Sequence, residues 1–488
     1  MIPYRVSQIR RLGPARLTAG LDQHRRLDLD AHRSIHGELG TESVDTLISM
    51  AEDVDLRGRG GAAFPFARKL RAVAARARDS ETVVLVNGAE GEPASVKDKM
   101  LLTRAPHLVL EGALLAAGAL NARQVVVAVA SGDMAEASMT AAVAERGAED
   151  SVRVAAIPER FISGEGGALV KAVNGQAGIP PGRKARSSDS GVDGLPTLLS
   201  NTETFAQLAV LGELGAEVYG SVGTVQEPGT TLLTVGGSAV FPAVVEVTPG
   251  VPLASVLDLC EAAVGDGVLV GGYHGAWLSA AQAYGAVVSR RGISQAGGSL
   301  GAGIVVPLGG ETCPLGEVLR VANYLAAQSS GQCGPCRLGL PDLARAMAEL
   351  SGGSSHGIEL VRRAASAVRG RGACFHPDGS ARFVMSALEA FADDVEEHRI
   401  HGTCGRPVLE MLPLPASESL EAKLVVDWTR CQAHGLCAHV APELVKLDQH
   451  GFPAVEEGGV PPWLRAEARR AVEMCPALAL RFPNAPPA

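Results

Sequence analysis

The sequence lacks a long apolar run. Its longest apolar stretches span residues 108–120 and 125–130, and Glu111, Asn121 and Arg123 interrupt or separate them. Neither stretch reaches the roughly 18 uncharged residues that a membrane-spanning helix requires. We therefore expect no membrane span.

An excess of positive charge is also missing, because 44 basic residues face 53 acidic ones and the net charge is −9. Nucleic-acid-binding domains usually carry a basic face, so we expect no nucleic-acid partner. The first 21 residues contain four arginines and no acid, but they lack the apolar segment of a secretory signal. We expect a mature N-terminus and a cytoplasmic protein.

The nine cysteines cannot all form disulfides, because their number is odd. Cys333 and Cys336 stand close together, and Cys431, Cys437 and Cys475 crowd the last 60 residues. In a cytosolic chain such clustering is typical of metal or iron–sulfur ligation rather than of disulfides.

The order of the patterns predicts a multidomain chain. Residues 1–56 have a helical pattern, and residues 57–225 alternate helical segments with strands at 83–86, 125–129 and 152–157. That alternation is typical of an α/β domain with a largely parallel sheet. We assign residues 1–225 to this domain.

The remaining residues divide into three further parts and a linker. Residues 226–310 predict a small α+β grasp domain with a hairpin at 230–247, a helix over 253–263 and a strand at 267–270. Residues 311–412 are expected to be helical, and 413–420 to be a proline-containing linker. Residues 421–488 open with a strand over 423–427 that leads into a cysteine loop, and they predict a small α+β domain.

Two glycine-rich turns, at residues 57–65 and 87–93, flank a basic helical stretch and the strand over 82–86. Glycines let backbone N–H groups close around a phosphate, and a following helix points its positive end at the same place. Lys69 lies in that helix, where its charge complements a phosphate. Either turn alone could equally be glycine-rich for steric reasons.

Five short blocks, at residues 56–64, 87–93, 104–112, 164–165 and 201–204, together resemble one family. It is the 51 kDa-type, NADH-oxidising FMN subunit of respiratory complex I, with relatives in soluble hydrogenases and formate dehydrogenases. The resemblance covers about residues 40–410. It implies an α/β flavin domain, a ubiquitin-like grasp domain of the SLBB type and a helical cluster domain.

The resemblance also implies roles for single residues, with FMN as the cofactor and NAD(H) or NADP(H) as the electron donor. The residues implied to hold the FMN phosphate and ribityl chain are Gly58, Gly60, Gly61 and Lys69. The residues implied to line the flavin ring are Asn87, Glu90, Gly164, Glu165 and Asn201. The residues implied to face the nicotinamide nucleotide are Phe64 and Glu92.

The sequence departs from the family pattern at four places. Ala89 and Gly166 replace acidic residues, Ala72 replaces an aromatic one, and residues 184–190 lack the aromatic that helps hold the dinucleotide. An aromatic contact contributes about 0.5–1.5 kcal/mol beyond area burial. We therefore expect FMN binding to be kept and nucleotide binding to be weak or altered in specificity.

Cys333, Cys336 and Cys374 match three of the four cysteines that bind a 4Fe–4S cluster in this family. Ser330 stands at the position of the fourth. Three thiolates could hold a 3Fe–4S cluster, a 4Fe–4S cluster completed by serine or an outside ligand, or no cluster.

The last segment resembles bacterial single-cluster ferredoxins through Cys431, His434, Cys437 and Cys475, which Pro476 follows. A third cysteine often replaces the histidine in them, so three thiolates predict a 3Fe–4S cluster, with 4Fe–4S as the alternative. Zinc bound by the Cys/His set is a further alternative, and His434 could be a plain loop residue.

The other cysteines and histidines are given no role as ligands. We expect Cys260 to lie in the core and Cys313 and Cys404 to be incidental. His376, His398 and His401 are expected to face solvent.

These features predict an electron-transfer chain. Electrons would pass from NAD(P)H through FMN, the helical-domain cluster and the ferredoxin cluster to an acceptor protein. A haem monooxygenase or another ferredoxin-dependent enzyme is the candidate acceptor. The alternative is a non-enzymatic electron-transfer or scaffold subunit with a degenerate flavin site, which a visible spectrum with and without NADH would distinguish.

Overall fold

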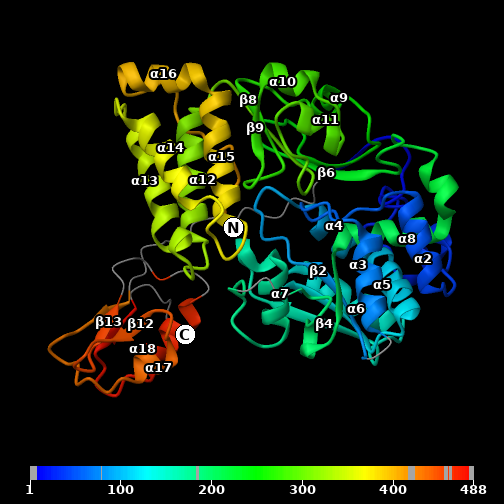
Figure 1. Ribbon diagram of the computed structural model, residues 1–488, viewed down its shortest axis with the longest axis horizontal. Helices are drawn as coiled ribbons and strands as arrows, with labels where there is room; N and C mark the ends of the chain where they lie inside the picture. The colour runs from blue at the N-terminus through cyan, green and yellow to red at the C-terminus, as the bar shows by residue number, and fades with distance from the viewer. Residues whose placement is uncertain are drawn as a thin grey trace. The chain divides into compact units, whose positions relative to one another are not determined.

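The computed structural model describes residues 8–77, 80–182, 186–415, 424–455, 460 and 464–482 (Figure 1). It divides into two compact units, one within residues 3–414 and one within residues 415–488. From residue 416 on, the predicted linker lies outside the described residues, as do residues 184 and 185 of the stretch 184–190.

A four-stranded sheet confirms the predicted α/β pattern. Its strands are all parallel, in the order β4-β3-β2-β5. The strands are β2 (Val83–Gly88), β3 (Gln124–Ala130), β4 (Val152–Ile157) and β5 (Thr197–Asn201).

Both faces of this sheet are buried, which explains why its strands are nearly continuous apolar runs. In β2, Val84 and Val86 pack into a core formed with six helices, whereas Val83 and Leu85 pack on the other side against α7. The helices on the first side are α2 (Val44–Asp53), α3 (Phe66–Arg76), α4 (Lys97–Arg104), α5 (Pro106–Leu120), α6 (Met134–Glu145) and α8 (Thr202–Gly220), and α7 spans Gly166–Val173.

The strand order creates a switch point between β2 and β5. From β2 the chain steps outward to β3 and β4, and it then returns to the opposite side of β2 to form β5. Asn87 and Asn201 are register partners at the carboxyl ends of these two strands. Open parallel sheets bind ligands at such a crevice.

A second, six-stranded sheet has the order β1-β7-β6-β10-β8-β9. The predicted hairpin is confirmed as the antiparallel pair β6 and β7, and the predicted strand at 267–270 is β8. The helix expected over 253–263 is shorter, α9 (Leu253–Leu259). The strands and remaining helices are β1 (Gln8–Leu12), β6 (Thr231–Val235), β7 (Ala243–Val247), β8 (Gly267–Val270), β9 (Ala276–Ser279), β10 (Ile304–Leu308), α10 (Ala280–Gly285) and α11 (Arg290–Gln295).

The helical expectation for residues 1–56 is wrong at its described start. Residues 8–12 form β1, which pairs in parallel with β7 and so joins the sheet built by the strands of residues 226–310. Farther on, α1 (Leu29–His36) and α2 are helices as expected. Strand β1 lies at an edge, and its pairing is made with residues more than 230 positions away, a contact that local periodicity does not encode.

Residues 314–401 are helical, as predicted. Figure 1 shows α12 to α15 packed side by side, with α16 across one end. Cys336 lies in a π-helical turn, η3 (Pro335–Gly339), a rare element that often marks functional sites. The helices are α12 (Pro314–Ala327), α13 (Leu340–Ser351), α14 (Gly357–Val368), α15 (His376–Ala390) and α16 (Ala392–His401).

The smaller unit contains two short antiparallel strand pairs and two helices among its described residues. The strand expected over 423–427 is observed at 425–426, where it pairs with residues 480–481. Its elements are β11 (Val425–Val426), α17 (Leu436–Val440), β12 (Val445–Leu447), β13 (Pro453–Val455), α18 (Arg465–Glu473) and β14 (Leu480–Arg481).

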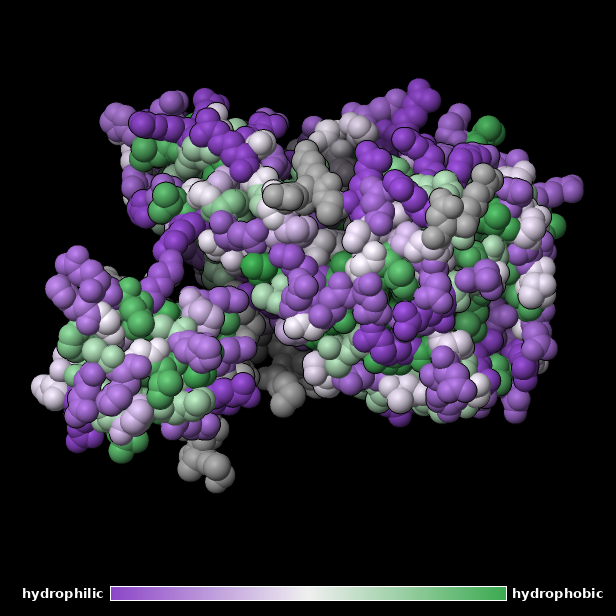
Figure 2. Space-filling model, turned by 60° about the horizontal axis from the view of Figure 1, so that its bottom comes forward, coloured by the Kyte–Doolittle hydropathy of each residue, from purple (hydrophilic) through white to green (hydrophobic). Residues whose placement is uncertain are grey.

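Polar side chains dominate the face shown in Figure 2, with apolar residues scattered between them. Within the described ranges, no single helix has the length and hydropathy to cross a membrane. One pair, α4 (Lys97–Arg104) with α5, passes that test jointly, but the two helices meet at 92°.

Glu246 on β7 joins the N-terminal segment to the second sheet. Its buried carboxylate accepts hydrogen bonds from the backbone N–H groups of Arg16, Leu17 and Thr18, at 2.9–3.2 Å, and from the Thr230 hydroxyl at 2.7 Å. A single side chain therefore satisfies three backbone donors that are buried far from any strand partner.

We expect Glu246→Ala to lower the free energy of unfolding by about 3 kcal/mol, because each orphaned buried donor costs about 1–3 kcal/mol. Chemical denaturation measures the change. The matched control is Glu217→Ala on an exposed position of α8, which should stay within about 0.5 kcal/mol of the wild type. Equal losses in both variants would contradict the role of Glu246.

Candidate cofactor sites

The glycine loop of residues 57–65 closes on itself directly before α3. Arg57 and Pro65 form an isolated bridge, and the Gly58 N–H donates to the Phe64 carbonyl at 3.0 Å. Gly61 has a φ of 106°, which favours glycine. A Cβ added to Gly60 would lie 3.2 Å from the Asn201 Cβ. The loop thus meets the switch point of the parallel sheet.

Lys69 lies on the first turn of α3, behind this loop. Its Nζ donates to the Leu199 carbonyl at 3.0 Å, and burial lowers the pKa of its ammonium group. Among the described residues it forms no salt bridge. A partly buried cation without an acidic partner, next to a glycine loop, fits a phosphate group.

Asn87, Gly164 and Asn201 come together at the carboxyl ends of the strands. The Asn87 Nδ2 donates to the Gly164 carbonyl at 3.0 Å. Asn201 caps α8 by accepting from the Glu203 N–H at 3.0 Å, and its Nδ2 donates to Asp98 at 2.6 Å. Protein contacts therefore hold both amides of the predicted flavin-lining set in place.

Sequence reasoning missed a buried charge network beneath this edge. Lys97 is 1% exposed, and its Nζ lies 2.8 Å from Asp98 Oδ1 and 2.9 Å from Glu203 Oε2. The Arg59 Nε lies 3.9 Å from Glu203 on its other side. Burial alone would lower the pKa of Lys97, but the carboxylates of Asp98 and Glu203 raise it. The network ties the glycine loop, α4 and α8 together.

The two glutamates predicted for the flavin ring, Glu90 and Glu165, occupy different surroundings. Glu90 is buried at the start of α4, where it accepts from the backbone N–H groups of Asp98 and Lys99 and from the Ser95 hydroxyl. Burial, followed by the Asp98 charge, raises the pKa of Glu90 to about 7. Glu165 instead caps α7 by accepting from the Ala168 N–H at 2.8 Å.

Glu92 points away from the parallel sheet, toward the six-stranded one. Its Oε2 accepts from the Tyr273 N–H at 3.1 Å, and within the described part of the chain its buried Oε1 has no hydrogen-bond partner. Burial raises the pKa of Glu92 to about 8, and the N–H groups of Tyr273 and Ala94 oppose that rise. An orphaned carboxylate oxygen is easier to bury when the group is protonated.

A cavity of about 640 Å³ opens beside the glycine loop. Residues 61–63 line it together with residues 297–301 of the six-stranded-sheet domain. Three arginines, Arg290, Arg369 and Arg382, and one acid, Glu389, also line it, and its described lining contains no aromatic residue. Phe64 lies on the same loop, is 41% exposed and carries Arg68 over its ring, 5.1 Å from the ring centroid.

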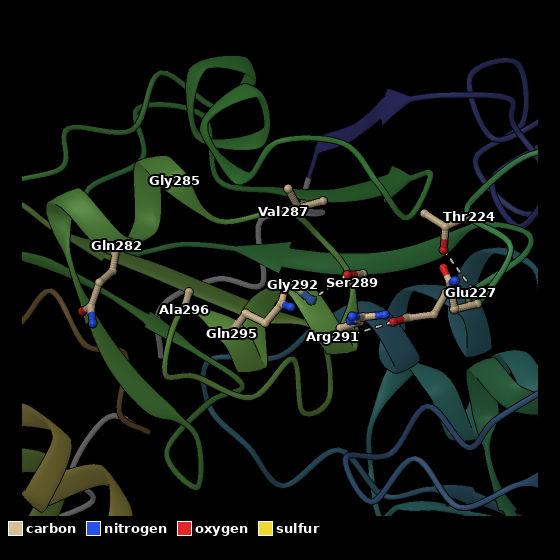
Figure 3. A pocket seen from close by; sticks show the side chains of 11 residues that line it. Thr224, Glu227, Gln282, Gly285, Val287, Ser289, Arg291, Gly292, Gln295 and Ala296 are labelled. Atoms are coloured by element: carbon tan, nitrogen blue, oxygen red, sulfur yellow. Dashed lines mark hydrogen bonds between the residues drawn. The ribbon is translucent and has the colours of Figure 1, made fainter.

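A further cavity of about 480 Å³ lies against the six-stranded sheet (Figure 3). Glu227 faces it and accepts from the backbone N–H of Arg291 at 3.4 Å. None of the predicted site residues lines this cavity, so we do not consider it a cofactor site.

Cys333, Cys336 and Cys374 form one group in the helical region. Burial, followed by the neighbouring Cys333 and Cys374 thiols, raises the pKa of Cys336 to about 12, and a hydrogen bond to Ser330 acts against that rise. The four residues predicted for this cluster are therefore neighbours in space.

This cysteine group lies next to the flavin motif. Burial raises the pKa of the Cys374 thiol, and the Glu165 carboxylate contributes to that rise. The Phe161 N–H donates to the Gln328 side chain at 3.3 Å, between the same two regions. The predicted flavin edge and the predicted cluster ligands thus meet within one compact unit.

In the smaller unit, Cys431, His434, Cys437 and Cys475 line a single hollow. Left-handed backbone at Ala433 (φ 55°) and Gly435 (φ 74°) turns the loop between the first two cysteines. The Ala479 N–H donates to the Cys475 Sγ at 3.4 Å, as backbone donors do around cluster sulfurs. The predicted ligands therefore face one site.

The expectations for the other histidines and cysteines are partly wrong. His376 and His398 are buried, because backbone carbonyls of Leu325 and Ser351 satisfy their rings at 2.8 and 2.7 Å. Cys313 and Cys404 lie beside His398, a grouping that sequence spacing does not reveal. Cys260 is buried and His401 exposed, as expected.

Three protein-family models match separate parts of the chain. Residues 51–210 match the Nuo51 FMN-binding domain, and residues 317–398 match the NADH-ubiquinone oxidoreductase-F iron-sulfur binding region. Residues 424–482 match a 4Fe-4S single cluster domain. The predicted FMN-binding domain and the two predicted iron–sulfur domains are confirmed.

Relatives and a solved structure support the same assignment. The NADH-quinone oxidoreductase F-type subunit of Streptomyces coelicolor is 26% identical over 416 residues, which cover 78% of this chain and 90% of that one. The Mycobacterium bovis protein of the same name is 28% identical over 392 residues, covering 75% and 87%. A chain of an NAD+-reducing NiFe-hydrogenase in the air-oxidized state aligns with a TM-score of 0.71 and 26% identity, over 80% of this chain and 68% of that one.

We expect Gly58→Ala to weaken FMN binding about tenfold or more without unfolding the chain. The new Cβ would meet only the Phe64 backbone, at an ordinary 3.6 Å, so any loss reports the space that the phosphate needs. Heat-released FMN per chain and FMN titration measure the change. The control is Gly236→Ala, whose Cβ meets nothing within 4 Å. Unchanged FMN affinity in Gly58→Ala would contradict the site.

The raised pKa of Glu92 predicts a pH-dependent stability. Between its usual pKa near 4.5 and about 8, the folded state binds more protons than the unfolded state, so stability falls as pH rises through that window. Glu92→Gln should remove this part of the fall. The test is the difference in unfolding free energy between wild type and variant from pH 5 to 8, and a flat difference would contradict the assignment.

Proposed function

Because the chain combines a Nuo51 FMN-binding domain, an oxidoreductase-F iron–sulfur region and a single-cluster ferredoxin domain, we propose that it is an electron-transferring oxidoreductase. Electrons would pass from NAD(P)H through FMN and two iron–sulfur clusters to an acceptor protein. FMN takes up two electrons as a hydride and releases them singly, and iron–sulfur centres carry one electron each.

The observation that carries this proposal is the contact between the segment before the flavin motif and the helical region. The Phe161 N–H donates to the Gln328 side chain at 3.3 Å, and the Phe161 ring packs edge-on against Tyr324 of α12 with the centroids 6.0 Å apart. The segment that leads into Gly164 and Glu165 thus contacts the helix that precedes Cys333 and Cys336.

The chain's own residues would hold FMN at the switch point. Gly58, Gly60 and Gly61 leave room for the phosphate, and Lys69 supplies a positive charge without an acidic competitor among the described residues. Asn87 and Asn201 present amides at the carboxyl edge, where backbone and carboxylate contacts fix their orientation. Such prior orientation lowers the cost of ordering the site on binding.

The cysteines would hold the clusters. Cys333, Cys336 and Cys374 supply three thiolates, with Ser330 beside them as a potential fourth ligand to a 4Fe–4S cluster. In the smaller unit Cys431, Cys437 and Cys475 would bind a 3Fe–4S cluster, with His434 positioned to complete a 4Fe–4S one. Thiolates are the preferred ligands of both types.

The arginine-lined cavity beside the glycine loop is the proposed entrance for the nucleotide. Arg290, Arg369 and Arg382 suit the phosphates of NADH or NADPH. The absence of aromatic side chains from the described lining removes the stacking that would hold the adenine, so we propose that binding is weak or altered in specificity.

We propose domain limits of 1–225 for the flavin domain, apart from strand β1, and 226–310 for a ubiquitin-like SLBB domain. Residues 311–412 would be the helical cluster domain, and 421–488 the ferredoxin domain. The acceptor would be a ferredoxin-dependent protein such as a haem monooxygenase, reached in the cytoplasm.

A second candidate function follows from the same cavity. If the nucleotide does not bind, the chain is a non-enzymatic subunit that only relays electrons between partner proteins. The aromatic-free lining and the replacements Ala89 and Gly166 favour this alternative.

Anaerobic titration of the full chain with NADH and with NADPH separates the two functions. We expect the flavin absorbance to bleach, and the electron paramagnetic resonance signal of an oxidised 3Fe–4S centre, at a g value of about 2, to disappear. In Cys374→Ala the flavin should still bleach while the signal persists, because the intermediate cluster is lost. Cys260→Ala is the control, since that thiol lies in the core of the six-stranded-sheet domain. A flavin that neither nucleotide reduces would establish the relay alternative.

A further inference from the structure

Cys313, His398 and Cys404 form a compact group away from both cluster sites. Their ligand atoms all lie within 4.8 Å of one another, and among the residues that the structure describes these three make up the whole group. Cys313 and His398 are each 4% exposed, whereas Cys404 is only partly buried. The group therefore has one side open to solvent.

The His398 ring is oriented as a metal ligand. Its Nδ1 lies 2.7 Å from the Ser351 carbonyl oxygen, which can only accept a hydrogen bond, so Nδ1 carries the proton. The unprotonated Nε2 then faces Cys313 Sγ at 3.3 Å. A carbonyl that fixes the tautomer in this way is a common partner of zinc-bound histidine.

Donors face both sulfur atoms. Cys313 caps α12, and its Sγ accepts from the Gly316 N–H at 3.3 Å at the positive end of a 14-residue helix. The Arg406 guanidinium contacts Cys404 and is itself held by Asp266 and Asp394. These contacts balance the charge that two bound thiolates would bring.

We propose that Cys313, His398 and Cys404 bind one zinc ion, with water in the fourth position on the open side of Cys404. Two thiolates and one imidazole are a ligand set that zinc prefers. Ligands about 2.3 Å from one tetrahedral ion lie about 3.8 Å apart, so a group this tight suits a single ion rather than an iron–sulfur cluster.

The ion would fix the end of the larger unit. Residues 404–412 return to the start of α12, where the Cys313 N–H donates to the Pro407 carbonyl at 2.7 Å and the Met411 N–H donates to Glu317 at 3.0 Å. Zinc would add a bond from this returning segment to both α12 and α16. The proposed ion would thus hold this returning segment in place, apart from the electron path.

Metal analysis of the full-length, iron- and flavin-loaded protein tests the site. After incubation with zinc and removal of the excess, we expect about one zinc per chain. X-ray absorption at the zinc edge should show two sulfur neighbours at about 2.3 Å and nitrogen or oxygen neighbours at about 2.0 Å. Cys404→Ser and His398→Gln should each lose the zinc while keeping their iron and FMN, because neither residue belongs to those sites.

The matched control is Cys260→Ala, which removes a free buried thiol elsewhere and should keep the zinc. Should either ligand variant lose iron and FMN as well, Cys313→Ser provides a second variant with the same expected readout. The proposal is overturned if the wild type takes up no zinc, if the ligand variants retain it, or if peptide mapping finds a Cys313–Cys404 disulfide in protein purified under reducing conditions.

Discussion

The buried ammonium group of Lys97 is the interaction on which the candidate flavin site depends. It lies between Asp98 and Glu203, and both carboxylates have further duties, since Asp98 holds the Asn201 amide and Glu203 accepts from Leu232 in the six-stranded sheet. Removing one partner of such a buried pair leaves an uncompensated charge and typically costs about 3–5 kcal/mol. The position of Asn201, and through it of the glycine loop at Gly60, therefore rests on this ion pair.

Packing contacts also connect the predicted flavin edge to the predicted cluster ligands of the helical region. Glu165 caps α7 and also lies near Cys374, so the start of α7 is a shared boundary of the two regions. Phe161, just before it, packs edge-on against His274 and Tyr324, which come from the six-stranded-sheet domain and from α12. Three parts of the chain thus meet around one short segment.

Local sequence patterns predicted the parallel sheet well, because β-branched runs such as residues 83–86 and 125–129 are buried on both faces and bounded by glycine or polar residues. The sequence spacing of Cys431, Cys437 and Cys475 likewise predicted a shared site, and all three residues line one hollow. Strand β1 escaped prediction because its partner is far away in the sequence. The burial of His398 was not predicted for a similar reason. The polar sequence of α16 does not indicate that Ser351 and Cys313 contact the His398 ring. Contacts between distant segments decide burial there.

The surroundings of Gly166 and Ala89 show how the protein accommodates two of the departures from the family pattern. At Gly166 an added Cβ would lie 3.0 Å from Leu199 Cδ2, so a glutamate at this position would need β5 or its side chains to shift. At Ala89 the backbone N–H still donates to the Asn87 side chain, a contact that does not depend on an acidic residue. Neither replacement therefore removes a backbone contact at this edge of the sheet. The described contacts of Asn87 and Asn201, which the resemblance assigns to the flavin, thus remain in place despite these departures.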